Sequence, residues 1–355
     1  MKKRTIAVLV ALLTFAVGVA IARLTLPRFR TSAPPPAPAK HEIQLSNYRL
    51  SGPYQHENLT IFLVHGPDQA FSGPYTPLQQ AMERKLVAVY ETSEVNELAI
   101  ENRSASEEVF VQAGDIVRGG QQDRTLAVDL IVPTKSGRIP IDAFCVESGR
   151  WTQRGAESAV EFSSSQDMVA TKELKFATKA EASQARVWRE VETAKEQLSH
   201  SVHADIAAVA SRSSMQLALE NDKVRESAAK YIDKLTSLVD EHRDVIGFVF
   251  AINNKLNSAD VYPSNAMFKQ FWPRLLKAAA VEAVSSPAAA RAAHQALSIN
   301  AVGDFIVAAE KGSESLNDVT KRTHMVKRES EQGIFFETRD MAHGGAWVHR
   351  NYLTR

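Results

Sequence analysis

Residues 113–124 hold the densest group of side chains suited to ligand chemistry in this chain, with the sequence AGDIVRGGQQDR. Two adjacent glycines allow backbone shapes closed to other residues, and an arginine can hold a carboxylate or phosphate through two parallel hydrogen bonds. We expect Asp115 to act as an acid–base group. We expect the end of the stretch to bind a polar ligand through Gln121, Gln122, Asp123 and Arg124. The competing interpretation is a hairpin connection with a salt-bridged rim, and the pattern is neither a P-loop nor a dinucleotide fingerprint.

A second group lies at residues 145–151, with the sequence CVESGRW. Glu147 follows a predicted strand and is either a general base that activates water or the ion-pair partner of Arg150. Trp151 either stacks on a planar ligand or packs at a sheet edge. Glu147 therefore joins Asp115 as a catalytic candidate, and Arg150 and Trp151 join the ligand-binding candidates. We expect Arg124 and Glu147 to face each other across one hollow.

Thiol and metal chemistry receive little support from the sequence. Cys145 is the sole cysteine, which excludes an internal disulfide and a cysteine-based zinc cluster. It alternates with Ile141 and Ala143, so we expect a buried, inert thiol. His343 and His349 flank turn glycines without a matching set of acidic residues. We assign no metal ligand, and the sequence identifies no cofactor.

The elements that must position these residues follow from hydrophobic periodicity. Short apolar and β-branched runs between 43 and 151 predict strands. Apolar residues at steps of three or four predict helices over 168–311, within which the apolar run 245–252 favours a buried strand. Strands return over 322–353 and are expected to rejoin the N-terminal sheet. The sequence thus predicts one α+β domain over 43–355, with a mostly antiparallel N-terminal β region and a central helical region.

Three local features refine this layout. Small, polar residues over 155–167 predict a loop. Thr76, before Pro77, is a candidate N-cap for a helix starting there, and Ser264 or Asn265 is a candidate N-cap for a later helix.

The N-terminal segment predicts export. Residues 1–5 are basic, residues 6–22 carry no charge, and residues 23–42 form a Pro-rich linker. The apolar run is either an uncleaved membrane anchor or a signal peptide cleaved near Ala22. We expect the membrane as a partner through this segment, and a single-pass protein of the inner (cytoplasmic) membrane with its body exported; the alternative is a secreted or periplasmic protein.

Composition limits the class of function. The chain has 355 residues, of which 44% are hydrophobic and 23% charged, as in globular proteins. Residues 1–40 contain seven basic and no acidic side chains, so the remaining body carries a net charge of about −6 against +1 for the whole chain. A nucleic-acid-binding surface needs clustered cations, so we expect no nucleic-acid partner.

The order of these motifs is similar to that of a known family. Gly114-Asp115, the run 119–124, the run 145–151 and Val348-His349 resemble the signature of the ADP-ribosylglycohydrolase- and rhodanese-phosphatase-associated protein family, over residues 45–353. The resemblance implies an association with proteins that process ADP-ribose and a role in NAD-linked metabolism, with no established reaction. The family commonly has Lys and Asn where this chain has Gln121 and Asp123, which weakens a phosphate-clamping role for the loop.

Two principal functions follow as hypotheses. The first is a membrane-tethered extracytoplasmic domain that binds a polar ligand or partner through the loop 115–124 without turnover. The second is a hydrolase acting on ADP-ribosyl or related nucleotide groups, in which Arg124 and Gln122 hold the ligand and Asp115 or Glu147 activates water. A third is a structural partner for another envelope protein.

Overall fold

A nine-stranded sheet is the largest element in the computed structural model, which describes residues 41–71, 73–169, 171–286 and 296–355. Its order is β1 (His41–Gln44), β2 (Arg49–His56), β3 (Leu59–His65), β13 (Val245–Ile252), β14 (Lys255–Val261), β18 (Ala346–Thr354), β17 (Gly333–Asp340), β16 (Thr323–Glu329) and β15 (Ser313–Asp318). Every neighbouring pair is antiparallel. The C-terminal strands therefore join the N-terminal ones, with β18 inside the sheet between β14 and β17.

Two smaller sheets form the second β region. One has six strands in the order β12 (Ser163–Met168), β8 (Asp115–Arg118), β9 (Arg124–Leu126), β11 (Arg138–Cys145), β6 (Glu97–Asn102) and β5 (Val87–Glu91). The other has the order β10 (Leu130–Val132), β7 (Glu108–Val111) and β4 (Tyr75–Pro77). All these pairs are antiparallel except β4 with β7. Their apolar faces share one core, which includes Val89, Val111 and Leu126.

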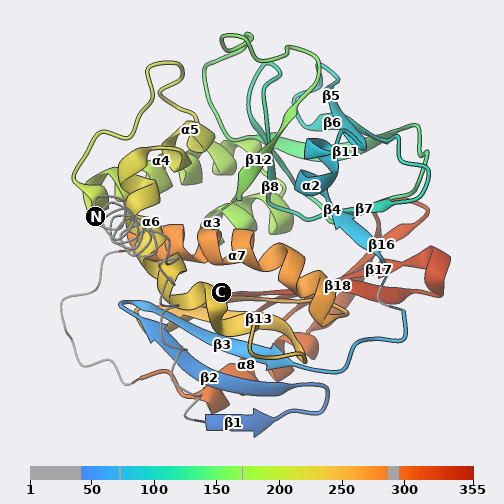
Figure 1. The fold of residues 1–355 in the computed structure, drawn as a ribbon, viewed down its shortest axis with the longest axis vertical. Helices are drawn as coiled ribbons and strands as arrows, with labels where there is room; N and C mark the ends of the chain where they lie inside the picture. Colours follow the sequence, from blue (N-terminus) through green and yellow to red (C-terminus); the bar gives the residue numbers. More distant parts are fainter. Residues whose placement is uncertain (1–40, 72, 170, 287–295) are drawn as a thin grey trace, which may run out of the picture. The chain divides into compact units, whose positions relative to one another are not determined.

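Helices cover both faces of the large sheet (Figure 1). Their bounds are α2 (Leu78–Glu83), α3 (Lys172–Lys175), the π-helix η1 (Phe176–Ala180), α4 (Gln184–Val202), α5 (Met215–Leu219), α6 (Asp222–Leu235), the 3₁₀-helix η2 (Thr236–Val239), α7 (Asn265–Ser285), α8 (Ile299–Glu310) and the 3₁₀-helix η3 (Met341–His343). β13 is buried throughout because its alternate side chains face opposite layers. Phe248 and Phe250 lie in the core with α7, whereas Val249 packs with α8.

The predicted α+β fold class is confirmed, with one local difference. The described residues belong to a unit that spans Pro36–Arg355. Within the predicted loop 155–167, Ser163 begins strand β12, which pairs with β8. Small polar residues suit this strand because three of its six residues stay exposed or only partly buried.

The predicted membrane partner and inner-membrane location are corrected here. Among the residues that the structure describes, no helix is both long and apolar enough to span a bilayer. The segment 6–22, on which those predictions and the alternative of cleavage near Ala22 depended, lies outside the described residues, as does most of the linker 23–42.

Candidate functional site

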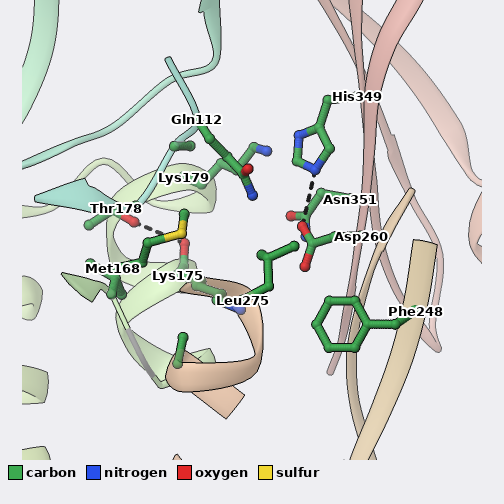
Figure 2. Close-up of a pocket in the computed structure, with 14 residues that line it drawn as sticks. Gln112, Met168, Lys175, Thr178, Lys179, Phe248, Asp260, Leu275, His349 and Asn351 are labelled. Atoms are coloured by element: carbon green, nitrogen blue, oxygen red, sulfur yellow. Dashed lines mark hydrogen bonds and ion pairs between the residues drawn. The ribbon is translucent and has the colours of Figure 1, made fainter. Parts of the chain in front are cut away.

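An enclosed cavity lies where the helical region meets the large sheet (Figure 2). Its walls come from the turn before β8 and from β12, α3, η1, α7, β13, β14 and β18; the polar lining residues are Gln112, Lys175, Thr178, Lys179, Asp260, His349 and Asn351. The cavity volume is about 20 Å³, which is room for one water molecule.

His349 links two carboxylates across this cavity. Its Nδ1 lies 2.8 Å from Asp129 Oδ2 and its Nε2 lies 3.1 Å from Asp260 Oδ1. Burial alone would lower the pKa of His349, but the charges and hydrogen bonds of Asp129 and Asp260 outweigh burial and raise it. Each ring nitrogen faces a carboxylate oxygen, an arrangement that favours a proton on both. An imidazolium of this kind has no lone pair with which to accept a proton.

Two lysines approach the same carboxylates from the helical side. Lys179 Nζ lies 3.6 Å from Asp129 Oδ2, and Figure 2 shows its side chain reaching toward His349. Lys175 Nζ lies 3.5 Å from Ser258 Oγ, beside Asp260. Lys179 belongs to the π-helix η1, a rare element that is frequent at functional sites.

The charges at this cavity neutralise one another. Burial would raise the pKa of Asp129 and of Asp260, yet the lysines and His349 lower both. A general base works best with a pKa near the working pH, so neither carboxylate is suited to proton transfer. Asp260 Oδ2 is buried and has no hydrogen-bond partner among the described residues. The arrangement is suited to holding one water molecule. It also joins the turn before β8, the helical region and the large sheet.

Asp115 lies at the edge of this cavity, apart from the rest of the predicted loop site. Its Oδ1 is 2.7 Å from Arg274 Nη1 on α7, and its Oδ2 accepts the backbone N–H of Gln112. Burial raises the pKa of Asp115 despite the charge of Arg274. Both carboxylate oxygens are therefore engaged within the core.

Asp123 and Glu147 share a second buried network. Arg154 holds Asp123 with Nη1–Oδ2 and Nη2–Oδ1 distances of 2.7 and 2.9 Å, and Ser214 donates to Asp123 Oδ2. The backbone N–H of Asp123 donates to Glu147 Oε2 at 3.1 Å. Arg150 donates to both oxygens of Glu147. Burial would raise the pKa of Glu147, but these hydrogen bonds lower it.

Arg124 faces a different environment from Glu147. It pairs with Cys145 across β9 and β11, and its Nη1 donates to Val95 O at 2.5 Å and contacts Cys145 Sγ at 2.6 Å. Its Nη2 is 3.5 Å from Glu91 Oε1. The segments that carry Arg124 and Glu147 are neighbours, but the two side chains form separate ion pairs.

Unpartnered polar atoms gather around the predicted binding loop. Buried side-chain atoms without a hydrogen-bond partner in the described part of the chain include Arg118 Nε, Gln121 Oε1, Gln122 Oε1, Arg124 Nε and Nη2, Thr125 Oγ1 and Glu157 Oε2. Native proteins leave few such atoms, and each needs an explanation such as a bound water or ligand. Trp151 is 47% exposed, and the Arg124 guanidinium lies 5.7 Å from its ring centroid.

Sequence analysis missed the partners of the predicted residues. Arg154, Ser214 and Arg274 complete the networks of Asp123 and Asp115, and Asp129 and Asp260 complete that of His349. Long sequence separations, 159 residues for Asp115 and Arg274, left no local signal. Cys145 is buried as expected, and burial raises the pKa of its thiol to about 11.

The fold and the loop define a class: an α+β domain with a buried, incompletely paired arginine beneath an exposed tryptophan. The chain belongs to the ARG and Rhodanese-Phosphatase-superfamily-associated Protein domain family, ARPP-1, whose model matches residues 47–353. The match agrees with the predicted family. No curated protein and no solved structure gives a significant match to the chain.

Proposed function

We propose that this domain binds a small anionic ligand that carries a flat ring, using Arg124 as the anion partner and Trp151 as the stacking surface. The observation that carries the proposal is that Arg124 is buried with incomplete hydrogen bonding. Its side chain is fully buried, and Nη2 is 3.5 Å from Glu91 Oε1, an ion-pair distance. Neither Nε nor Nη2 has a hydrogen-bond partner within the described structure. A buried guanidinium with unused N–H groups is costly unless a ligand or water completes it.

Trp151 supplies the second half of the site. Its ring is exposed on one side and lies over the Arg124 guanidinium on the other. An aromatic ligand ring on the exposed face would bury apolar surface and stack in the way that aromatic pairs favour. The nearby amide oxygens of Gln121 and Gln122 are unpartnered acceptors, so the ligand also needs N–H or O–H donors.

The surface turn that holds Val95 contacts Arg124. The guanidinium donates to the carbonyl of Val95, whose side chain is 41% exposed. In the loop that leads to Arg124, Gly119 and Gly120 have φ values of 112° and 57°, a backbone region in which residues with a Cβ are strained. An anion that displaces the Val95 carbonyl would bind Nη1, and a second oxygen of that anion would accept from the neighbouring, unpartnered Nη2.

Binding is better supported than hydrolysis. Asp115 and Glu147, the two candidate bases, each hold an arginine, and the pKa of Glu147 is lowered, with burial outweighed by its hydrogen bonds. Ligands that contain adenine, ribose and phosphate meet the chemical requirements of the loop, and the family's association with ADP-ribosylglycohydrolases makes ADP-ribose the first probe.

The test titrates the full chain with ADP-ribose, with AMP and with inorganic phosphate, and follows tryptophan fluorescence. We expect saturable quenching by ADP-ribose and AMP, with weaker binding of phosphate because it lacks the ring. Trp151→Phe should remove most of the quenching because it removes the responding indole. Trp151→Ala should weaken binding about fivefold or more, since loss of an aromatic stacking surface costs about 1–3 kcal/mol.

Trp347→Phe is the matched control, because Trp347 also stacks on an arginine, Arg350, at 4.4 Å. It should leave binding unchanged. Absence of saturable binding by all three probes contradicts the proposal. Mass spectrometry of the same mixtures separates binding from turnover, since release of ribose or of a mononucleotide would establish the hydrolase hypothesis instead.

A further inference from the structure

Two histidines and an aspartate meet at the end of the large sheet, on elements that do not form the loop site. His65 ends β3, and Asp244 immediately precedes β13; these strands pair antiparallel, with Val245 opposite His65. His242 lies two residues before Asp244. One nitrogen or oxygen from each of the three side chains can be chosen so that all lie within 4.8 Å of one another. We infer that His65, His242 and Asp244 bind one divalent transition-metal ion.

The distances suit such an ion after a small movement. In a tetrahedral site with metal–ligand bonds of about 2.0–2.1 Å, ligand atoms lie about 3.4 Å apart. His65 Nδ1 and Asp244 Oδ1 are already 3.0 Å apart. His242 is partly buried on a loop, so its ring can move the remaining distance of about 1.4 Å or less, the difference between the 4.8 Å limit and 3.4 Å.

The surrounding hydrogen bonds favour metal ligation. Metal-binding histidines donate their second ring N–H to a nearby acceptor, which fixes the ring and its tautomer. Ser51 Oγ lies 2.7 Å from His65 Nε2 and is the acceptor for the tautomer that carries its proton on Nε2. Arg49 Nη2 lies 2.7 Å from Asp244 Oδ2 and orients the carboxylate. With Nε2 donating, the His65 Nδ1 lone pair and the Asp244 oxygen point toward each other, which is favourable when a cation lies between them.

A catalytic triad is the alternative for the same residues. Ser51, His65 and Asp244 form a serine–histidine–aspartate chain of hydrogen bonds. A nucleophilic serine must reach its substrate, however, and Ser51 is only 1% exposed, whereas the Asp244 side chain is 51% exposed. An ion can therefore enter from the aspartate side. Three protein ligands leave a fourth position for water, as in catalytic zinc sites, and the donor set of imidazole and carboxylate suits Zn²⁺ and Co²⁺.

The experiment uses the full chain without an added histidine tag, stripped with a chelator and titrated with Zn²⁺ by calorimetry and with Co²⁺ by visible absorption. We expect one ion per chain and the strong visible bands of four-coordinate Co²⁺. His242→Gln and Asp244→Asn should each weaken binding about tenfold or more. Both side chains lie partly or largely in solvent, so the variants should fold, which circular dichroism verifies. Thermal unfolding gives a second measurement, because Zn²⁺ should raise the melting temperature of the unmodified chain.

His324→Gln is the matched control, since His324 faces one aspartate, Asp318, at 3.2 Å. It should bind Zn²⁺ as the unmodified chain does. The inference is overturned if the chain binds no stoichiometric Zn²⁺, if folded His242→Gln binds it with unchanged affinity, or if Co²⁺ shows only the weak bands of a six-coordinate ion. None of these outcomes depends on the ligand of Arg124.

Discussion

Arg150 holds Glu147 through two parallel hydrogen bonds, with Nε 2.6 Å from Oε1 and Nη2 2.7 Å from Oε2. The carboxylate is fully buried, and the arginine side chain is 10% exposed. Of the two roles that the sequence left open for Glu147, general base and ion-pair partner, this geometry fits the second. Arg150 immediately precedes Trp151 in the chain, so this charge pair adjoins the proposed ligand site.

Glu147→Gln should lower the free energy of unfolding by about 3 kcal/mol, because it leaves the Arg150 charge without its buried partner. Urea denaturation measures this change. The control is Asp222→Asn, which breaks a pair with Arg225 whose side chains are 80% and 56% exposed; exposed pairs contribute little. Equal effects of the two variants would show that the buried pair is not structural.

His349 should give stability that declines in alkaline solution. Despite burial, its pKa is raised above the ordinary 6.5 by Asp129 and Asp260, so the folded state retains a proton that the unfolded state releases. The contribution of this proton to the free energy of unfolding is complete below about pH 6.5. It is lost as the pH rises through the pKa that His349 has in the folded state. The loss of stability caused by His349→Gln, measured by urea denaturation, should therefore shrink from about pH 6 to about pH 9. A loss that grows over this range would contradict the proposed imidazolium.

Replacing Glu282 should stabilise the protein as the pH rises, whereas replacing His349 destabilises it. Burial raises the pKa of Glu282 from 4.5 to about 7 despite the opposing charge of Lys175. The unfolded state thus loses its proton first, and stability from this group falls as the pH rises through this range. Glu282→Gln should gain about 3 kcal/mol relative to the unmodified chain between about pH 4 and pH 8. Thermal and urea unfolding at both pH values test this, and a constant difference would refute it.

Cys145 should react slowly in the folded protein. Burial raises the pKa of its thiol to about 11 despite the charge of Arg124, and the thiolate is the reactive form. A thiol reagent should modify it only after denaturant is added, with one thiol counted per chain. Rapid modification without denaturant would show that this strand opens readily.

Strong local signals predicted the fold well. The apolar run 245–252 became β13, and Ser264 caps α7 as expected. Thr76 does not cap a helix, because it lies within strand β4, which pairs with β7, and α2 begins only at Leu78. Local sequence shows that such a hydroxyl is available, but not that pairing with a distant strand will draw the residue out of the helix start.

In the candidate site, too, partners that are close in sequence could be predicted and distant ones could not. The pairing of Glu147 with Arg150 was foreseeable because the two are three residues apart. The partners of Asp115 and His349 lie 159 and 220 residues away on other elements, so only the tertiary fold reveals them. Arg124 and Glu147, which we expected to face one hollow, form separate ion pairs on neighbouring segments.

The interior position of β18 has a consequence for how the protein is made. Every other strand of the nine-stranded sheet precedes β18 in the chain and is therefore translated earlier, yet β14 and β17 meet only through it. A nascent chain that stops short of residue 346 holds two separate half-sheets with exposed edges, which can pair with other chains. Ribosomes must complete residues 346–354 before the sheet can close, so this domain cannot reach its final form during the earlier stages of its own synthesis.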